Sequence, residues 1–211
     1  MKNAIPTTRR ATGPMALIAL AALAAGCLSR SPEPRTFTLG GTPPVAGEDR
    51  ASSVAVQIGP LRFPRYLERP QFVRRVRGGE LDLDESVRWA DSFEENVLRA
   101  LRLDIERRLD SNRIFDHTQD PPVQLDQRAL VDFDELVVGP DDVLRMRARW
   151  TVLALPGGPR TLARADLDVP LRDGSIEARV EAHEQAIEAL GAAIAGEIAR
   201  RDAAGAAEAD E

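Results

Sequence analysis

An alternating segment within residues 143–155 constrains the fold of this 211-residue chain more than any other feature. Apolar side chains occupy every second position, and from Leu144 to Val152 polar side chains occupy the positions between them. The apolar set is Leu144, Met146, Ala148, Trp150, Val152 and Ala154, and the polar set is Arg145, Arg147, Arg149 and Thr151. This period of two predicts a β-strand with one buried and one solvated face. The strand must therefore belong to a sheet that a second layer covers on one side.

Neighbouring segments predict the strands that pair with it. Residues 129–138 precede it across a turn at 139–142, and residues 161–171 follow it across a Pro-Gly-Gly-Pro loop. Both carry aspartates on their polar faces, so we expect rows of arginine and aspartate to pair across an antiparallel sheet. Further strands are predicted at 36–39, 53–59 and 71–77. Three prolines between residues 60 and 70 predict that this stretch is not an internal strand.

Two amphipathic helices complete the predicted fold. One spans Glu85 to Leu109, with Asp82 and Glu85 as a variant of the N-terminal capping box. The other spans Ile176 to Arg201, and His183 lies on its apolar line. We therefore predict a single α+β domain over residues 36–201, with a largely antiparallel sheet of five or six strands packed against two long amphipathic helices. Residues 202–211 hold only alanine, glycine and acidic residues and are predicted to be disordered.

The N-terminus has the features of an export signal. Basic residues (Lys2, Arg9 and Arg10) precede an apolar run of 11 residues, too short to span a bilayer, which takes about 20. The run leads into Leu23-Ala24-Ala25-Gly26-Cys27, which resembles a bacterial lipobox although Ala24 replaces the usual leucine. We predict a lipoprotein signal peptide at 1–26 and a lipidated tether at 27–35. An ordinary signal peptide with a chance cysteine, or a short core helix, are the alternatives.

Lipidation would attach a diacylglycerol and a fatty acyl chain to Cys27, the only cysteine, and no other cofactor is expected. Several chains on one residue anchor a protein far more firmly than a single chain does. Cleavage before Cys27 would leave 25 basic against 34 acidic side chains, a charge of −9. This charge argues against a nucleic-acid partner. One cysteine and two histidines leave little for metal binding, and no nucleophile motif is present, so neither a metal site nor enzymatic activity is predicted.

The segment from Ile58 to Arg75 resembles the signature of the PqiC/YmbA-type ABC-transport auxiliary lipoproteins. The residues that carry the resemblance are Phe63-Pro64-Arg65-Tyr66-Leu67-Glu68-Arg69-Pro70-Gln71, followed by Arg88-Trp89-Ala90 and preceded by Phe37-Thr38-Leu39. Phe63, Glu68 and Phe72 depart mildly from the usual Leu, Asp and Ile.

The resemblance implies a non-enzymatic lipoprotein on the periplasmic face of the outer membrane. Its partners would be an MCE-domain protein and inner-membrane transporter components, in a system that moves lipid between membranes and supports envelope integrity. Leu28 and Ser29 follow the cysteine where an aspartate would mark inner-membrane retention. A structural or pilot lipoprotein that handles no lipid is the alternative. Self-assembly of the lipoprotein is left open.

Residues 60–77, which contain these prolines, are also a local positive region in an acidic chain. Six of its residues form the candidate contact for an acidic partner or lipid headgroups: Arg62, Arg65, Tyr66, Arg69, Arg74 and Arg75. The alternative is structural: Tyr66 and Leu67 would hold the loop against the core, while Arg69 caps carbonyl groups or pairs with an acid. The sequence favours neither of the two.

Overall fold

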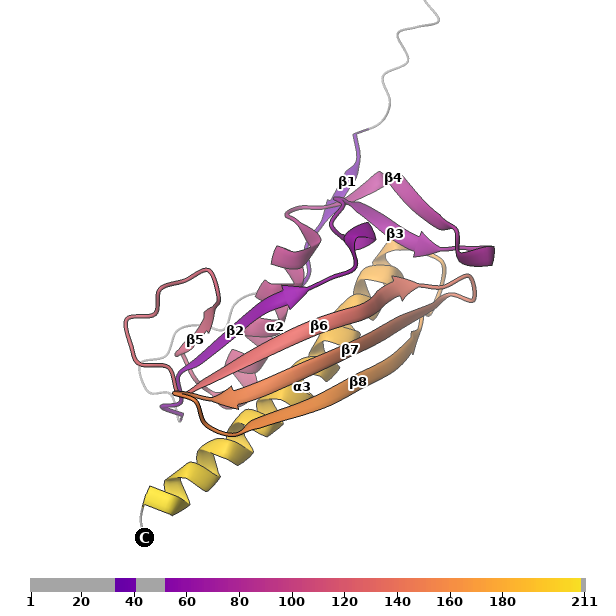
Figure 1. Cartoon of the computed structure of the whole chain (residues 1–211). Coiled ribbons are helices and arrows are strands. Elements are labelled where there is room, and N and C mark those ends of the chain that lie inside the picture. Colours follow the sequence, from indigo (N-terminus) through magenta and orange to yellow (C-terminus); the bar gives the residue numbers. More distant parts are fainter. Residues whose placement is uncertain (1–32, 41–51, 210–211) are drawn as a thin grey trace, which may run out of the picture. The chain divides into compact units, whose positions relative to one another are not determined.

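The computed structural model describes residues 33–40 and 52–209. The predicted signal peptide, Cys27 and most of the tether lie outside these residues. Between Pro34 and Ala209 the chain forms a mixed β-sheet with two helices packed on one face (Figure 1). The α+β class and the single domain are confirmed, while the sheet has eight strands rather than five or six.

The sheet is built around one strand, β6, which pairs with three others. The order β1-β4-β3-β6-β2-β5 describes one part, and β7 and β8 continue from the other edge of β6. The strands are β1 (Arg35–Phe37), β2 (Val56–Arg62), β3 (Gln71–Arg75), β4 (Leu81–Trp89), β5 (Ile114–Asp116), β6 (Gln127–Val138), β7 (Val143–Ala154) and β8 (Arg160–Pro170). The pairs β6–β7, β7–β8 and β3–β4 are antiparallel, and the remaining pairs are parallel.

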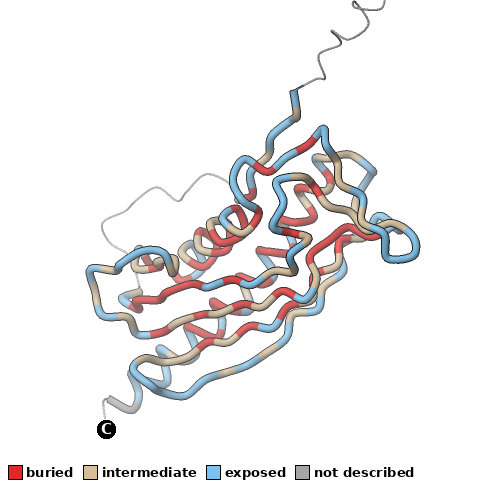
Figure 2. The backbone as a smooth tube through the Cα atoms, turned by 45° about the horizontal axis from the view of Figure 1, so that its top comes forward, coloured by how far each residue is buried: buried red, intermediate tan, exposed pale blue. Residues whose placement is uncertain are grey.

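The three long strands follow the predicted alternation. Buried positions recur along β6 and β7 (Figure 2), and the inward side chains of β7 from Leu144 to Val152 are at most 7% exposed. The expected charge rows pair in part: Arg147 contacts Asp168 at 2.5 Å, and Arg149 contacts Asp134 at 3.1 Å. Arg145 instead pairs with Asp141 of the preceding turn. The outer face is therefore held by both cross-strand and local ion pairs.

The first helix begins later than predicted. Residues 81–89 form strand β4, and helix α2 spans Phe93–Leu109. Ser92 caps this helix in a reciprocal capping box with Glu95: its hydroxyl accepts from the Glu95 backbone N–H, and the Glu95 carboxylate accepts from the Ser92 backbone N–H. The prediction that the helix starts near Glu85 was wrong because this Ser-x-x-Glu sequence satisfies the free amide groups of the first turn.

Strand β2 also departs from the prediction, because it passes through Pro60 and ends at Arg62. It is internal, with β5 on one side and β6 on the other. The proline is tolerated because the register to β6 shifts between Ile58 and Leu61 and the pairing to β5 ends at Ile58. Proline at a bulge forfeits no ladder hydrogen bond.

The last helix, α3, spans Ile176–Ala209, so the prediction of disorder from residue 202 was wrong for residues 202–209. Its inner face is fully buried at Ile187, Leu190, Ile194 and Ile198. Helix α2 buries Leu101 and Ile105 in the same core. Neither helix is long and apolar enough to span a membrane, among the residues described.

The two helices approach closely where a buried carboxylate meets a glycine. Asp104 of α2 is only 3% exposed and pairs with Arg107 and Arg108 of its own helix. Its carboxylate oxygen occupies the space that a Cβ atom at Gly191 of α3 would fill. A side chain at position 191 would therefore displace the Asp104 carboxylate from its ion pairs or push α2 and α3 apart.

We expect Gly191→Ala to destabilise the domain by about 1–3 kcal/mol, because the added methyl group overpacks the crossing. Gly196→Ala, five residues along the same helix, is the matched control. No atom lies within 4 Å of its prospective Cβ, so this change should stabilise the helix by about 0.5–1 kcal/mol. Urea unfolding of both variants checks the prediction, and equal effects of the two substitutions would contradict it.

Candidate functional site

The predicted contact segment folds as a tight turn between two strands. A 3-10 turn, η2, spans Arg65–Leu67 and connects β2 to β3. Leu67 is 5% exposed in the core, and Tyr66 packs against the core from its partly buried position. The predicted structural role of Tyr66 and Leu67 is confirmed, because both side chains pack against the core and hold the turn there.

Three of the five candidate arginines are paired with acids. Arg62 contacts Asp132 at 3.4 Å, Arg74 contacts Asp82 at 3.7 Å, and Arg75 contacts Glu135 at 3.2 Å. All three acids lie on neighbouring strands, so these pairs also join the segment to the sheet. Their positive charge is largely compensated within the domain.

Arg65 and Arg69 behave differently. Both are exposed, and neither side chain has an ion pair or hydrogen bond among the residues that the structure describes. The alternative role for Arg69, capping carbonyl groups or pairing with an acid, is therefore not seen within residues 33–40 and 52–209. The structure reduces the predicted basic site to these two available guanidinium groups.

The two free arginines border a surface groove of about 440 Å³. Tyr66 and three residues of the β3–β4 hairpin line it: Val73, Leu81 and Leu83. Arg65 also borders a second groove, lined in part by Leu61, Phe63 and Phe93. Apolar lining beneath uncompensated positive charge suits a ligand or partner segment that combines apolar side chains with acidic groups.

Tyr66 contributes its ring to the groove. Its hydroxyl group is buried beside the Arg75 guanidinium of the Arg75–Glu135 pair. Burial raises the pKa of the phenol; the Arg75 charge lowers this pKa and the Glu135 charge raises it. The side chain is therefore a neutral, apolar wall of the groove.

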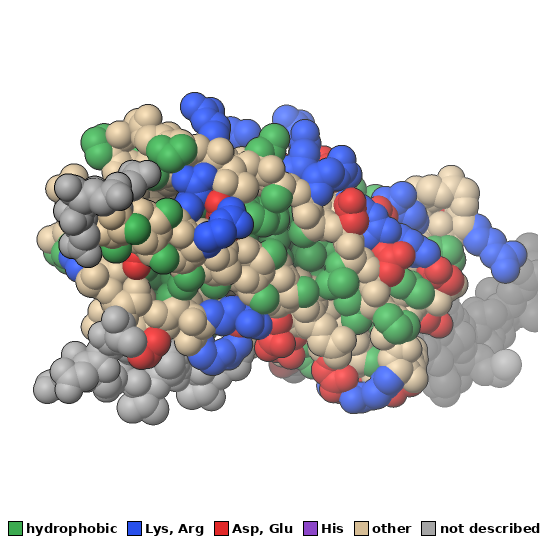
Figure 3. Space-filling model, turned by 90° about the horizontal axis from the view of Figure 1, so that it is seen from below, with side chains coloured by type: hydrophobic (Ala, Val, Ile, Leu, Met, Phe, Trp, Pro, Cys, Tyr) green, Lys and Arg blue, Asp and Glu red, His purple; other side chains and the backbone are tan. Residues whose placement is uncertain are grey.

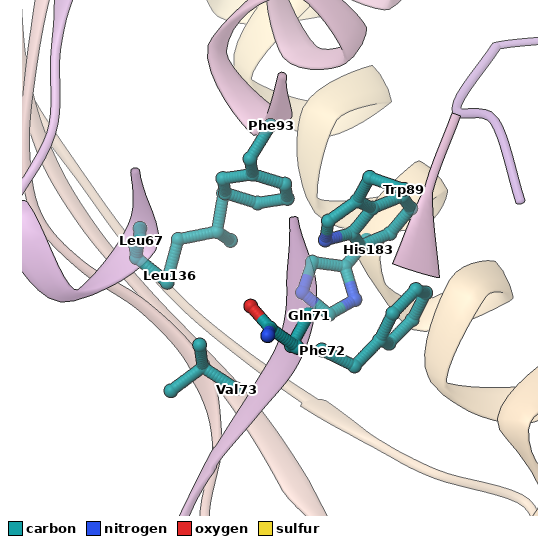
Figure 4. Close-up of a pocket in the computed structure, with 8 residues that line it drawn as sticks. All are labelled: Leu67, Gln71, Phe72, Val73, Trp89, Phe93, Leu136 and His183. Atoms are coloured by element: carbon teal, nitrogen blue, oxygen red, sulfur yellow. The ribbon is translucent and has the colours of Figure 1, made fainter. Parts of the chain in front are cut away.

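An aromatic cluster supports the turn from below (Figure 4). Phe72 stacks on Trp89 with ring centroids 3.9 Å apart. Phe93 is tilted against Trp89, and His183 packs edge-on against Phe72, Trp89 and Phe93. Trp89 belongs to the Arg-Trp-Ala part of the family signature, and it is 5% exposed. This part of the signature forms the core, whereas the Arg65 and Arg69 part faces solvent.

His183 is fully buried in this cluster and uncharged. Its Nδ1 atom lies 2.7 Å from the backbone oxygen of Arg179; because a carbonyl oxygen can only accept, Nδ1 carries the hydrogen. Burial lowers the pKa of the imidazole to about 4. The hollow beside it has a volume of about 10 Å³, room for one water molecule at most.

The groove lining was missed by sequence reasoning. Leu81 and Leu83 fell in a segment to which no element was assigned, although Leu81, Leu83, Val87 and Trp89 all have odd numbers and could have indicated a strand. The interruption at Glu85 weakened this signal. Among the described residues, no three His, Cys, Asp or Glu side chains are placed to hold a metal ion.

Comparisons with known proteins show the family and the fold of this chain. A family model described as "ABC-type transport auxiliary lipoprotein component" matches residues 37–195. A search of curated proteins found no match. The fold is similar to the crystal structure of an uncharacterized protein (TM-score 0.64, 15% identity, covering 79% of this chain and 99% of that one). It is also similar to protein XCC0632 of Xanthomonas campestris, of family DUF330 (TM-score 0.60, 15% identity, 82% and 99% covered).

The buried histidine predicts a pH-dependent stability. Unfolded His183 titrates at its ordinary pKa of about 6.5, whereas the folded state resists protonation down to about pH 4. Acidification between these values therefore favours the unfolded chain, by up to about 3 kcal/mol. Urea unfolding at pH 7, 5 and 4 should show a steeper loss of stability in the parent protein than in His183→Gln. Parallel pH profiles of the two proteins would refute the assignment.

Proposed function

The chain belongs to the family of ABC-type transport auxiliary lipoprotein components, and we propose that it docks an MCE-type lipid transport assembly at the outer membrane. In this proposal the mature protein is held by lipid on Cys27 at the periplasmic face. It contacts an MCE-domain protein and, through it, the inner-membrane transporter. The match over residues 37–195 is the observation that carries the proposal.

The proposed anchor rests on the sequence. The apolar run and the small residues before Cys27 suit a lipoprotein signal. The folded part begins shortly after this position, with β1 at Arg35. A lipid on Cys27 would therefore hold the domain within a few residues of the bilayer, so that it acts by location and contact.

The proposed contact is the groove beside the Arg65–Leu67 turn. Two unpaired guanidinium groups over apolar side chains favour an acidic partner surface with an apolar anchor. Electrostatic contacts of this kind set orientation and association rate more than they set affinity. The proposal assigns this surface to the MCE-domain partner.

A docking role is also consistent with the small size of the cavity beneath the turn. The enclosed hollow beside His183 holds about 10 Å³, far less than an acyl chain needs. The surface grooves are open to solvent, and we assign them to side chains of a partner rather than to lipid. We therefore propose that the domain has no catalytic step and carries no lipid in this hollow.

The anchor can be tested by metabolic labelling. The parent chain should incorporate labelled palmitate and fractionate with the outer membrane, because only a lipidated cysteine holds it there. Cys27→Ser should abolish the label and the membrane association together. An unlabelled parent chain that is recovered free in the periplasm would overturn the anchor while leaving the family assignment intact.

The contact can be tested by charge reversal. Arg65→Glu with Arg69→Glu should weaken binding to the MCE-domain protein of the same transport system by about tenfold or more. Affinity is measured by surface plasmon resonance at two salt concentrations, and the parent protein should lose affinity at high salt. Unchanged affinity in the double variant would exclude this groove as the contact.

The matched control is Arg128→Glu with Arg113→Glu. Neither arginine has an ion pair within the described part of the chain, and Arg113 donates a hydrogen bond to the backbone oxygen of Ser53. They lie near the start of β6, whereas β3 joins its far end at Val138. The control makes the same change of charge away from the groove and should retain the affinity of the parent.

A further inference from the structure

Strand β8 forms an open edge of the sheet. It pairs only with β7, and no other described strand lies beyond it. Its eleven residues, Arg160–Pro170, contain no proline before the last position and no irregularity in their register to β7. An edge of this length offers unpaired backbone N–H and C=O groups to another strand.

The inner face beside this edge is incompletely covered. The inward side chains of β7 from Leu144 to Val152 are at most 7% exposed, whereas Ala163, Ala165 and Leu167 of β8 stay partly exposed. On the outer face of the same strand, Leu162 is 70% exposed. Figure 3 views the side of the molecule where β8 and α3 lie, and hydrophobic side chains gather along its middle. One more strand beyond β8 would cover this surface.

The sequence of β8 is complementary to itself in one antiparallel register. With Ala165 opposite its own copy, all eleven residues pair, because Ala165 is the midpoint of the strand. Arg164 then faces Asp166 of the other copy, and this contact occurs twice. Ala163 faces Leu167 on the inner side, also twice.

Neighbouring registers are less favourable. A twofold axis through Arg164 or Asp166 places like charges directly opposite each other, and an axis through Leu167 places Asp166 opposite Asp168. An axis through Ala163 opposes no like charges, but it pairs only the seven residues from Arg160 to Asp166. Like charges in directly opposed positions destabilise a sheet. An odd shift is excluded because it turns the apolar side chains to the solvent face.

We propose that two copies of this chain associate through their β8 edges, about a twofold axis at Ala165, to form one continuous sheet. Each protomer contributes its free backbone groups, its Arg164 and Asp166 charges and its partly covered apolar row. Within one protomer Arg164 lies 3.5 Å from Asp166. In the dimer these four side chains form one alternating cluster.

Cysteine cross-linking in membranes tests the axis with the full-length chain. Directly opposed residues in an antiparallel pair have Cα atoms about 4.5–5.5 Å apart, within the range of a disulfide. Ala165→Cys should therefore yield a disulfide-linked dimer on oxidation, beyond the level of the parent chain with its one cysteine. Ala163→Cys should not, because its copy lies four residues along the strand, roughly 13 Å away. Ala163→Cys combined with Leu167→Cys should restore the cross-link.

Charge exchange tests the register independently. Arg164→Asp should weaken the dimer about tenfold or more in sedimentation analysis of the detergent-solubilised protein, because it opposes like charges twice. Adding Asp166→Arg to the same chain restores opposite charges and should recover association to within about threefold of the parent. Circular dichroism controls for folding.

Three outcomes would overturn the proposal. One is a monomeric parent chain at all concentrations. Another is equal cross-linking of Ala163→Cys and Ala165→Cys, which would exclude the axis. The third is cross-linking of Ala165→Cys to a different protein in place of its own copy, which would assign the edge to another partner.

Discussion

Strand β6 is the constraint on which the rest of the structure depends, since β2, β3 and β7 all pair with it. β2 runs parallel to its first half, and β3 joins at Val138, its last residue. A register shift between Phe133 and Glu135 lets both Phe133 and Leu136 point into the core. The same irregularity places Glu135 beside Arg75. The strand that organises the sheet thus also fixes the position of the turn at Arg65–Leu67.

The signature segment combines two physical roles in a short stretch. Leu67 and Trp89 lie in the core, and loss of either would open a cavity beneath the turn. Arg65, inside the 3-10 turn, and Arg69, just after it, flank Leu67 in sequence but reach solvent. The buried residues fix where the charges are placed. A rigid support of this kind keeps the two guanidinium groups over the groove without ion pairs to hold them.

The long strands could be predicted from sequence because apolar and polar residues alternate along most of 143–154 and 160–170. Strand β4 was missed because Asp84, Glu85 and Ser86 break its alternation, and residues 90–109 then impose a helical period on the whole stretch. Helix α2 is capped by Ser92, because the side chains of Ser92 and Glu95 each accept a hydrogen bond from the other residue's backbone N–H. Asp82 and Glu85 have a similar capping pattern in the sequence, which predicted the earlier start. Which arginines remain unpaired could not be predicted, because Asp132, Asp82 and Glu135 reach Arg62, Arg74 and Arg75 only through the tertiary pairing of β2, β3, β4 and β6.

The sheet order separates the two proposed contacts. The groove lies on the β3–β4 hairpin, and the open edge lies on β8, with β6 and β7 between them. Association through β8 would therefore leave the groove of each protomer free, and a dimer would present two grooves on the outer parts of one continuous sheet. Two linked sites raise the effective concentration of the second binding event, so modest contacts at each groove can give strong overall attachment. Weak binding at each groove, through Arg65, Arg69 and the apolar lining, is then sufficient for docking. This requires a partner assembly that presents its acidic surface more than once.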